Sequence, residues 1–394
     1  MLSAMDDTTD DNTGDTTSAP ARADALIDLD AIRDNVRVLA DRARNATVMA
    51  VVKADGYGHG LIPAARAAVA GGASWLGVTT IDEGLDLRKA GLEQPVLAWL
   101  NVPGDRWVDG VRVGIDLSAN ATWTIDEIST AAQRTGLIAR LHLKIDTGLG
   151  RGGAARQDWP ELIDAALKAE AAGYVKIVGL WSHFAYADEP GHPTIGRQIG
   201  AFQDAVDFAE GRGVRPEVRH LANSAATLTL PEAHFDMVRP GIAVYGITPV
   251  PQHGPPSIFG LRPAMTLRAR VILTKRVPAG QGVSYGHQYR TSTPTTLALV
   301  PLGYADGIPR SATNLGPVLA GGIRRQIAGR VCMDQFVLDV GDDQLSAGDE
   351  VVLFGPGDRG EPTAEDWARA LDTIAYEIVT RIGPRVPRTY LGRL

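Results

Sequence analysis

The stretch VMAVVKADGYGHG, residues 48–60, joins an apolar run to a polar, glycine-rich segment. Five consecutive apolar residues predict a strand that is buried on both faces, as in a parallel sheet covered by helices. Lys53 follows this run directly, so its amine is expected at the carboxyl end of a buried strand. In α/β folds, that end is where reactive groups gather.

Seven further apolar runs follow, and helical patterns such as Trp159–Ala172 and Ile195–Arg212 separate several of them. An amphipathic helix, Asp28–Arg44, precedes them all. This alternation predicts an α/β fold whose N-terminal part is a (β/α)8 TIM-like barrel. An open doubly wound sheet is the alternative, weakened because no G-x-G-x-x-G follows the first strand. The predicted barrel strands are Val48–Lys53, Trp75–Thr79, Val96–Leu100, Gly114–Ser118, Ala139–Asp146, Lys176–Ser182, Glu217–Ala222 and Phe235–Arg239.

The pattern changes after Pro249–Ser257, a segment rich in Pro and Gly that reads as a linker. Turn signals then separate strand-like runs, which predicts a mostly antiparallel β domain. One helix interrupts it, with Thr363 as N-cap and an end near Arg381. The predicted runs are Met265–Arg276, Thr296–Pro301, Gln326–Val340 and Glu350–Phe354. The resulting division is a disordered acidic tail at 1–23, a barrel domain at 24–255 and a β domain at 256–394.

Composition narrows the function classes. The chain has 39 Lys+Arg against 46 Asp+Glu, a net charge of −7, which argues against a nucleic-acid partner. No apolar run approaches the roughly 18 residues that span a bilayer, so no membrane partner is expected. The single cysteine, Cys332, forms no internal disulfide and no cysteine-based zinc site, and we expect no metal. These features predict a cytoplasmic protein.

Polar side chains follow several of the predicted strands. In a (β/α)8 barrel the carboxyl ends of all strands meet at one mouth, so residues far apart in the sequence would converge there. The residues at these positions are Lys53, Lys144, Asp146, Arg151, Ser182, His183, Asn223, Ser224 and Arg239. A lysine desolvated at such a place has a lowered pKa and becomes a nucleophilic amine. The alternative is that Lys53 is an ordinary lysine that extends its ammonium to solvent.

Motifs along the chain favour the first of these two readings of Lys53. In order, they are AVVKADGYGHG (50–60), LKIDTGLGR (143–151), WSHFAYADEP (181–190), HLANSAATL (220–228), RPGIAVYG (239–246), VSYG (283–286), GYADGIPR (303–310), GRVCMDQF (329–336) and TIAYEIVTRIGPRVPR (373–388). Together they resemble the alanine racemase family of fold-type III enzymes, which use pyridoxal 5′-phosphate (PLP). The resemblance covers roughly residues 24–394, and the succession of nine motifs is specific.

The resemblance implies a homodimer with shared active sites that interconverts L-alanine and D-alanine for peptidoglycan synthesis. Lys53 would bind the cofactor and act as one base. Tyr285, from the partner subunit, would be the other. Arg239 would face the pyridine nitrogen of PLP, supported by His183, although a histidine in an apolar strand is, taken alone, more often a core residue. Because arginine does not release its proton, the ring nitrogen would stay unprotonated, which favours reprotonation over other PLP reactions.

The remaining implied roles concern binding. Arg151 would contact the phenolate oxygen of PLP and, with the backbone of Met333 from the partner, the substrate carboxylate. Lys144 would be a candidate for carbamylation. The residues implied for the rest of the cofactor site, mainly its phosphate, are Tyr57, Asn223, Ser224, Gly241, Ile242 and Tyr376.

Three other functions share parts of this pattern. A broad-specificity amino-acid racemase differs only in few pocket side chains. A decarboxylase of basic amino acids has the same architecture but favours a carboxylate where Arg239 stands. A non-catalytic PLP carrier lacks a C-terminal β domain, whereas this chain has about 140 residues after the linker.

Overall fold

A closed barrel of eight parallel strands forms the first part of the chain, as predicted. The computed structural model describes residues 21–392, so nearly all of the predicted acidic tail lies outside the described residues. Each strand pairs with the next one in sequence, and β9 closes the barrel against β2. The strands are β2 (Thr47–Val51), β3 (Trp75–Val78), β4 (Val96–Ala98), β5 (Ile115–Ala119), β6 (Ala139–Lys144), β7 (Val175–Trp181), β8 (Val218–His220) and β9 (Met237–Val238).

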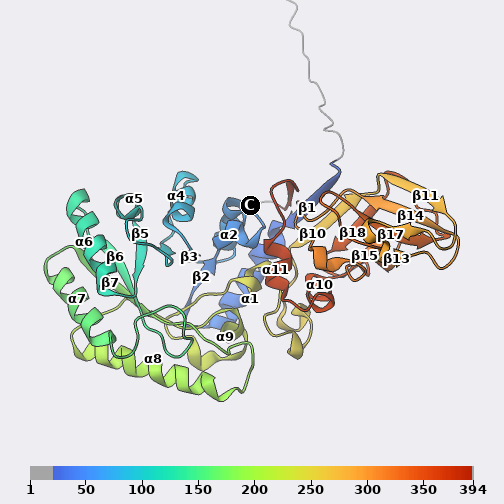
Figure 1. Ribbon diagram of the computed structural model, residues 1–394. Coiled ribbons are helices and arrows are strands. Elements are labelled where there is room, and N and C mark those ends of the chain that lie inside the picture. Colours follow the sequence, from blue (N-terminus) through green and yellow to red (C-terminus); the bar gives the residue numbers. More distant parts are fainter. Residues whose placement is uncertain (1–20, 393–394) are drawn as a thin grey trace, which may run out of the picture.

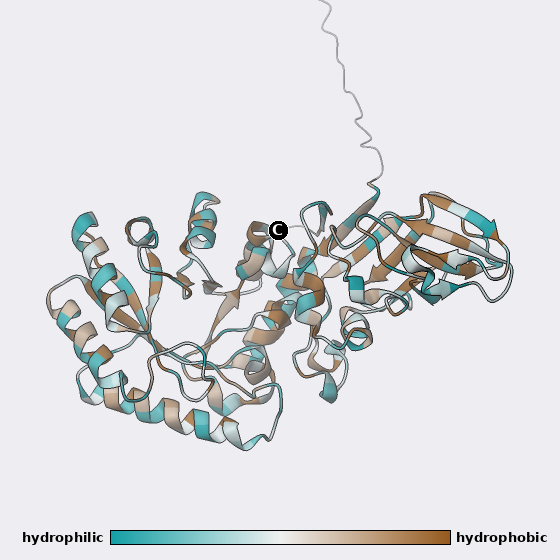
Figure 2. Cartoon of the chain, in the orientation of Figure 1, coloured by the Kyte–Doolittle hydropathy of each residue, from teal (hydrophilic) through white to brown (hydrophobic). Residues whose placement is uncertain are grey.

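Helices cover the outside of the barrel (Figure 1). The first begins where predicted, because the Asp28 side chain accepts a hydrogen bond from the Ala31 N–H at 3.0 Å and caps it. Most residues of the strands beneath are hydrophobic (Figure 2), and β3 and β5 are buried at every residue. The helices are α1 (Leu29–Ala43), α2 (Lys53–Tyr57), α3 (Leu61–Ala70), α4 (Ile81–Lys89), α5 (Trp107–Arg112), α6 (Thr122–Thr135), α7 (Trp159–Ala171), α8 (Pro193–Gly211) and α9 (Ser224–Thr229). Within residues 21–392, no helix combines the length and apolar character needed to cross a membrane.

A β domain follows, built on a six-stranded sheet, and it lies beside the barrel at the other end of the molecule (Figure 1). In spatial order its strands are β16 (Ile323–Gln326), β15 (Pro317–Ala320), β18 (Glu350–Phe354), β10 (Met265–Arg270), β1 (Ala23–Asp28) and β19 (Arg388–Leu391). A three-stranded sheet joins β11 (Leu273–Val277), β14 (Thr295–Val300) and β17 (Phe336–Gly341), and a hairpin joins β12 (Gly282–Val283) to β13 (Tyr289–Arg290).

The N-terminal strand β1 belongs to this β domain and not to the barrel. It pairs antiparallel with β10 and parallel with β19, so the predicted barrel domain starting at residue 24 is corrected there. The physical reason is burial: Ala23, Ala25 and Ile27 are buried in the main hydrophobic core of the chain. The proposed division near residue 255 stays a prediction.

Two predicted β runs are divided in the structure. Met265–Arg276 becomes β10 and β11, which lie in different sheets. Gln326–Val340 is strand only at its two ends, and the intervening loop carries Met333. That loop packs against the backbone at Gly303, where a Cβ atom would overlap the carbonyl oxygens of Cys332 and Met333. The close approach holds the loop out of the sheet.

The single helix predicted from Thr363 to Arg381 is two helices, α10 (Ala364–Ala370) and α11 (Ala375–Thr380). Thr363 caps the first, as predicted. The helix breaks because Asp372 adopts a left-handed conformation, with φ of 54°. The break directs α11 back toward α2 and brings Tyr376 near the barrel mouth.

Asn35 on α1 ties the barrel to the chain that leaves it. Its amide donates to the carbonyl oxygens of Val244 (3.2 Å) and Arg262 (2.9 Å) and accepts from the Arg262 N–H (2.8 Å). Asn35→Ala is expected to lower the free energy of unfolding by about 2–4 kcal/mol, because it leaves buried backbone groups without partners. Urea unfolding measures this loss. The exposed Asn45→Ala change should cost less than about 0.5 kcal/mol, and an equal loss in both variants would contradict the prediction.

Candidate active site

Lys53 lies at the carboxyl end of β2, where the chain enters an unusual left-handed turn. Ala54, Asp55, Gly56 and Tyr57 have φ values of 53°, 54°, 60° and 53°. For residues other than glycine this conformation costs about 1–2 kcal/mol each, and such strain concentrates at functional sites. The turn ends the strand abruptly and leaves the Lys53 amine at the barrel mouth.

Glu83, which the sequence analysis missed, holds this turn in place. One of its carboxylate oxygens accepts from the Ala54 N–H at 2.7 Å, and the other accepts from the Thr79 N–H at 2.8 Å. The spacing Thr80-x-x-Glu83 is a capping-box signature, and the box is present at the start of α4. That signature could have predicted the helix start, but not the contact with the lysine turn.

Four cationic side chains converge on the mouth. Burial lowers the pKa of Lys53, and Arg151 lowers it further, while Glu83 opposes both. Burial also lowers the pKa of Lys144, to about 8, with Arg239 and Arg151 adding to the effect. Among the described residues, Glu83 acts against the lowering of the pKa of Lys53 and Asp146 against that of Lys144, but both pKa values remain lowered, so the site favours anionic ligands.

Asp146 shapes the loop that carries Arg151. Its carboxylate accepts from the N–H groups of Gly148 (2.9 Å), Leu149 (2.8 Å) and Arg151 (3.0 Å). Burial opposes its charge, but these hydrogen bonds prevail and lower its pKa. The Arg151 side chain remains exposed at the rim.

Arg239, just beyond β9, is 5% exposed, and both terminal nitrogens of its guanidinium make hydrogen bonds. Its guanidinium donates to His220 Nδ1 (3.1 Å) and to the Ser182 carbonyl (2.8 Å), and it lies 3.4 Å from His183 Nδ1. Among the described residues, no carboxylate forms an ion pair with it. Burial lowers its pKa to about 9, still above neutral, so it remains charged at pH 7. His183 was predicted beside Arg239, whereas His220 was not singled out.

Trp181 and Trp99 form the aromatic floor of the mouth and were also missed. Trp181 lies beneath both Lys144 Nζ (4.3 Å to the ring centroid) and the Arg239 guanidinium (4.9 Å). Lys53 Nζ lies 5.9 Å from the Trp99 ring. Cation–π contact stabilises the charges without neutralising them. Both tryptophans stand at or just after strand ends, the same positional signal that identified the polar residues.

A second cluster gathers around Tyr57, at the other side of the mouth. The N–H of Gly241 donates to Ser224 Oγ at 2.8 Å, and a Cβ on Gly241 would overlap the Tyr57 hydroxyl. The Tyr57 and Tyr376 rings lie 6.3 Å apart. Asn223 instead caps α9, since its side chain accepts from the Ala226 N–H at 3.0 Å. The predicted residues Tyr57, Ser224, Gly241, Ile242 and Tyr376 are therefore brought together.

Tyr285 and Met333 do not join this site within one chain. Tyr285 is 72% exposed and Met333 is 53% exposed. Tyr285 lies in a short turn between β12 and β13, and Figure 1 places β13 far from β2. Both side chains project from the surface of the β domain.

A (β/α)8 barrel with a desolvated lysine and a cluster of cations at its mouth, followed by a β domain, defines a class of two-domain barrel enzymes acting on anionic ligands. Comparisons with known proteins specify the family. The profile described as "Alanine racemase, N-terminal domain" matches residues 27–249, and "Alanine racemase, C-terminal domain" matches residues 264–390. The chain belongs to the alanine racemase family.

Named relatives agree along the whole length. The chain is 62% identical to an alanine racemase of Frankia casuarinae, over 97% of this chain and 100% of the relative. The crystal structure of alanine racemase from D-cycloserine-producing Streptomyces lavendulae is 58% identical, with a TM-score of 0.94 over 95% of this chain and 98% of that one. Alanine racemase from Streptomyces coelicolor A3(2) is 59% identical, with a TM-score of 0.93 over 94% and 98%.

Proposed function

We propose that the chain is an alanine racemase that interconverts L-alanine and D-alanine with pyridoxal 5′-phosphate, supplying D-alanine for peptidoglycan. The observation that carries the proposal is the Lys53 amine, desolvated at the end of β2 and faced by cations. Attack on an aldehyde requires the unprotonated amine, and the lowered pKa of Lys53 makes that form easier to reach than in a solvated lysine. A cytoplasmic location belongs to the proposal and is supported by the single cysteine.

The residues around Tyr57 fit the cofactor's phosphate. Ser224 Oγ already accepts from the N–H groups of Gly241 (2.8 Å) and Ala243 (3.3 Å), so its own hydroxyl hydrogen is available to an anion. Glycine at 241 keeps the backbone close to the Tyr57 hydroxyl. Two phenols, a hydroxyl and backbone groups can thus surround one phosphate, with Tyr376 on the α11 side.

Bound PLP supplies an aldehyde and an electron-withdrawing ring that acidifies the Cα proton of an attached amino acid. Arg239 would hold the ring nitrogen by donating a hydrogen bond to it. The guanidinium keeps its proton, so it binds the nitrogen without protonating it. This limits the electron withdrawal and favours return of the proton to Cα.

Racemisation removes a proton from one face of Cα and returns one to the other, so two groups on opposite faces are needed. Lys53 Nζ would serve one face and the Tyr285 hydroxyl the other. Tyr285 is exposed in the turn before β13, a strand that Figure 1 places far from β2, so within this site it would have to come from a second copy. This supports a homodimer with shared sites, in which Arg151 and the Met333 backbone hold the substrate carboxylate.

Lys144 is proposed to react with carbon dioxide, which converts its neutral amine to a carbamate and releases a proton. The product is an anion among the cations Lys53, Arg151 and Arg239. Since only the neutral amine reacts, the carbamate fraction should rise as pH increases through about 8. With ¹³C-bicarbonate, NMR is expected to show a carbamate resonance that Lys144→Gln removes. No resonance above pH 8 would contradict this.

The function is tested by incubating the purified protein with a panel of L-amino acids and measuring the chirality of each product. Fast racemisation of alanine alone supports the proposal. Comparable rates with several larger side chains would favour a broad-specificity amino-acid racemase instead. Release of carbon dioxide without inversion would contradict both.

A further inference from the structure

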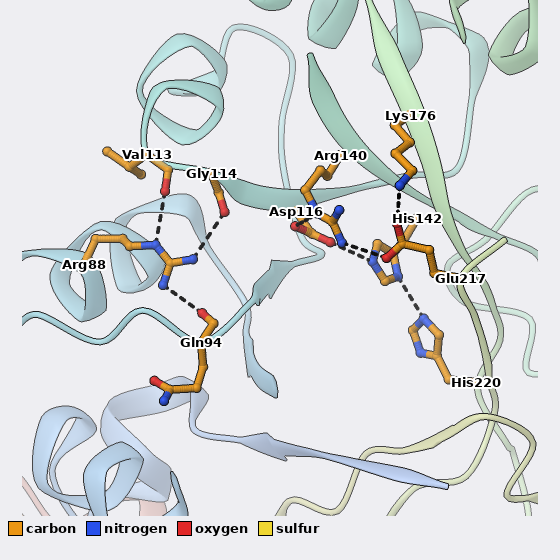
Figure 3. A network of polar contacts seen from close by, with 10 residues as sticks. All are labelled: Arg88, Gln94, Val113, Gly114, Asp116, Arg140, His142, Lys176, Glu217 and His220. Atoms are coloured by element: carbon orange, nitrogen blue, oxygen red, sulfur yellow. Dashed lines mark hydrogen bonds and ion pairs between the residues drawn. The ribbon is translucent and has the colours of Figure 1, made fainter. Parts of the chain in front are cut away.

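A row of buried polar side chains crosses the barrel interior and ends on Arg239. His220 Nδ1 lies 3.1 Å from the guanidinium, His220 Nε2 lies 2.9 Å from His142 Nδ1, and His142 Nε2 lies 3.1 Å from Asp116 Oδ2. These four residues, here called the relay, are each at most 5% exposed. Figure 3 shows the part of the relay from Asp116 through His142 to His220. Of these four residues, only Arg239 has a role in the proposed binding of the cofactor.

The geometry fixes every proton along the relay. An arginine N–H can only donate, so His220 Nδ1 must accept and the ring proton lies on Nε2. That proton faces His142 Nδ1, which must accept in turn, so the His142 proton lies on Nε2. It then faces the Asp116 carboxylate, which accepts. The hydrogen bonds therefore run in one direction, from arginine to carboxylate, through two neutral imidazoles.

Aromatic side chains pack against both imidazole rings. Trp181 stacks on His220 with ring centroids 5.6 Å apart and an interplanar angle of 6°. Trp75 packs edge-on against His142 at 5.5 Å. Burial, with Arg239 and His142 nearby, lowers the pKa of His220 well below its usual value, which agrees with a neutral ring.

The carboxylate end of the relay is anchored by charge. Arg140 Nε donates to Asp116 Oδ1 at 2.9 Å, so each carboxylate oxygen has its own partner. Arg140 also pairs with Glu217 at 3.2 Å, and Glu217 pairs with Lys176 (Figure 3). The direct bond from Arg140 holds the buried Asp116 carboxylate in place, and Glu217 and Lys176 lie outside this contact.

We propose that the relay is a positioning device for the racemase reaction: the Asp116 carboxylate orients Arg239 through two imidazoles that are each held in one tautomer. Asp116 is a positioning residue, because it touches neither substrate nor cofactor. It supplies a remote counter-charge that holds the guanidinium toward the pyridine nitrogen. A carboxylate next to that nitrogen would instead accept a hydrogen bond from it and stabilise its protonated form. This inference rests on the proposed function.

Without the Asp116 carboxylate, His142 and His220 should no longer each be held in one tautomer. An amide at this position can turn its NH₂ group toward His142 and reverse both hydrogen bonds, which would place an N–H of His220 against an N–H of Arg239. Asp116→Asn is therefore expected to lower kcat by about 10- to 100-fold, the loss found when a hydrogen-bond partner that orients a metal-binding histidine is removed. KM for alanine should change less than about twofold, since substrate contacts are intact.

The test combines kinetics with ¹⁵N NMR of the histidine rings in the wild-type holoenzyme. Protons on Nε2 of both His142 and His220 are expected; a proton on Nδ1 of either ring overturns the relay without any variant. Glu217→Gln, which breaks the outer ion pairs only, is the matched control and should keep wild-type kcat. A kcat for Asp116→Asn within twofold of wild type, or an equal loss in the control, also overturns it. Failure of the wild type to racemise alanine would reject the proposed function. The ¹⁵N NMR measurement of the two histidine rings would then still test the hydrogen-bond directions of the relay.

Discussion

Lys53→Ala is expected to abolish both racemisation and the visible absorbance of the bound cofactor. Lys53 directly follows the end of β2, and burial lowers the pKa of its amine, which is why we propose it as the nucleophile of the site. Losing a residue that forms the covalent attachment should reduce kcat by at least about 10⁴-fold. Absorbance spectroscopy and a chiral assay of alanine measure the two effects.

Lys89→Ala is the matched control. Lys89 lies on α4, its side chain is 74% exposed, and it pairs only with Asp86. This variant should keep wild-type absorbance and rate. If Lys53→Ala retained the absorbance and the activity, the amine would not hold the cofactor and the assignment of the site would be wrong.

Tyr285→Phe is expected to lower kcat by about 10²- to 10⁴-fold, the range for removing a general acid or base. The change deletes one hydroxyl from a side chain that is already exposed, so the stability of the chain should hardly move. Tyr289→Phe serves as the control. It removes a hydroxyl only four positions away, one that donates to Asp339 at 2.8 Å, and it should leave kcat unchanged.

Co-expression of the Tyr285→Phe and Lys53→Ala chains tests whether two subunits share each site. A mixed dimer contains one site with both wild-type residues and one with neither. If the chains pair at random, half of the dimers are mixed, and roughly a quarter of wild-type activity should return. Activity no higher than that of the separate variants would contradict a site built from two chains.

The barrel was predictable because each of its strands carries a local signal. A short apolar run that lies between helical patterns in the sequence can be recognised from neighbouring residues alone. All eight predicted runs overlap the observed strands β2 to β9. The β domain was less readable. Its strands change partners, as β10 and β11 do, and nothing in the run Met265–Arg276 records the change of sheet.

The candidate site likewise contains residues that a local sequence signal identified and residues that it did not. Lys53, Lys144, Arg239 and Ser224 were found because strand ends converge in a barrel, a rule of topology that needs no contact information. Glu83 could not be found in this way. Its second role depends on a hydrogen bond to Ala54, 29 positions away, and no pattern in the helix sequence encodes that partner.

The sequence by itself determined the barrel, the β domain after it and the chemistry at the ends of the strands, because periodicity and turn residues act over a few neighbouring positions. The tertiary structure alone decided that β1 joins the C-terminal sheet, that Tyr285 faces outward and that His142 meets His220 across 78 positions. Such contacts depend on which surfaces bury one another when the whole chain packs, and burial of distant surfaces leaves no local pattern to read.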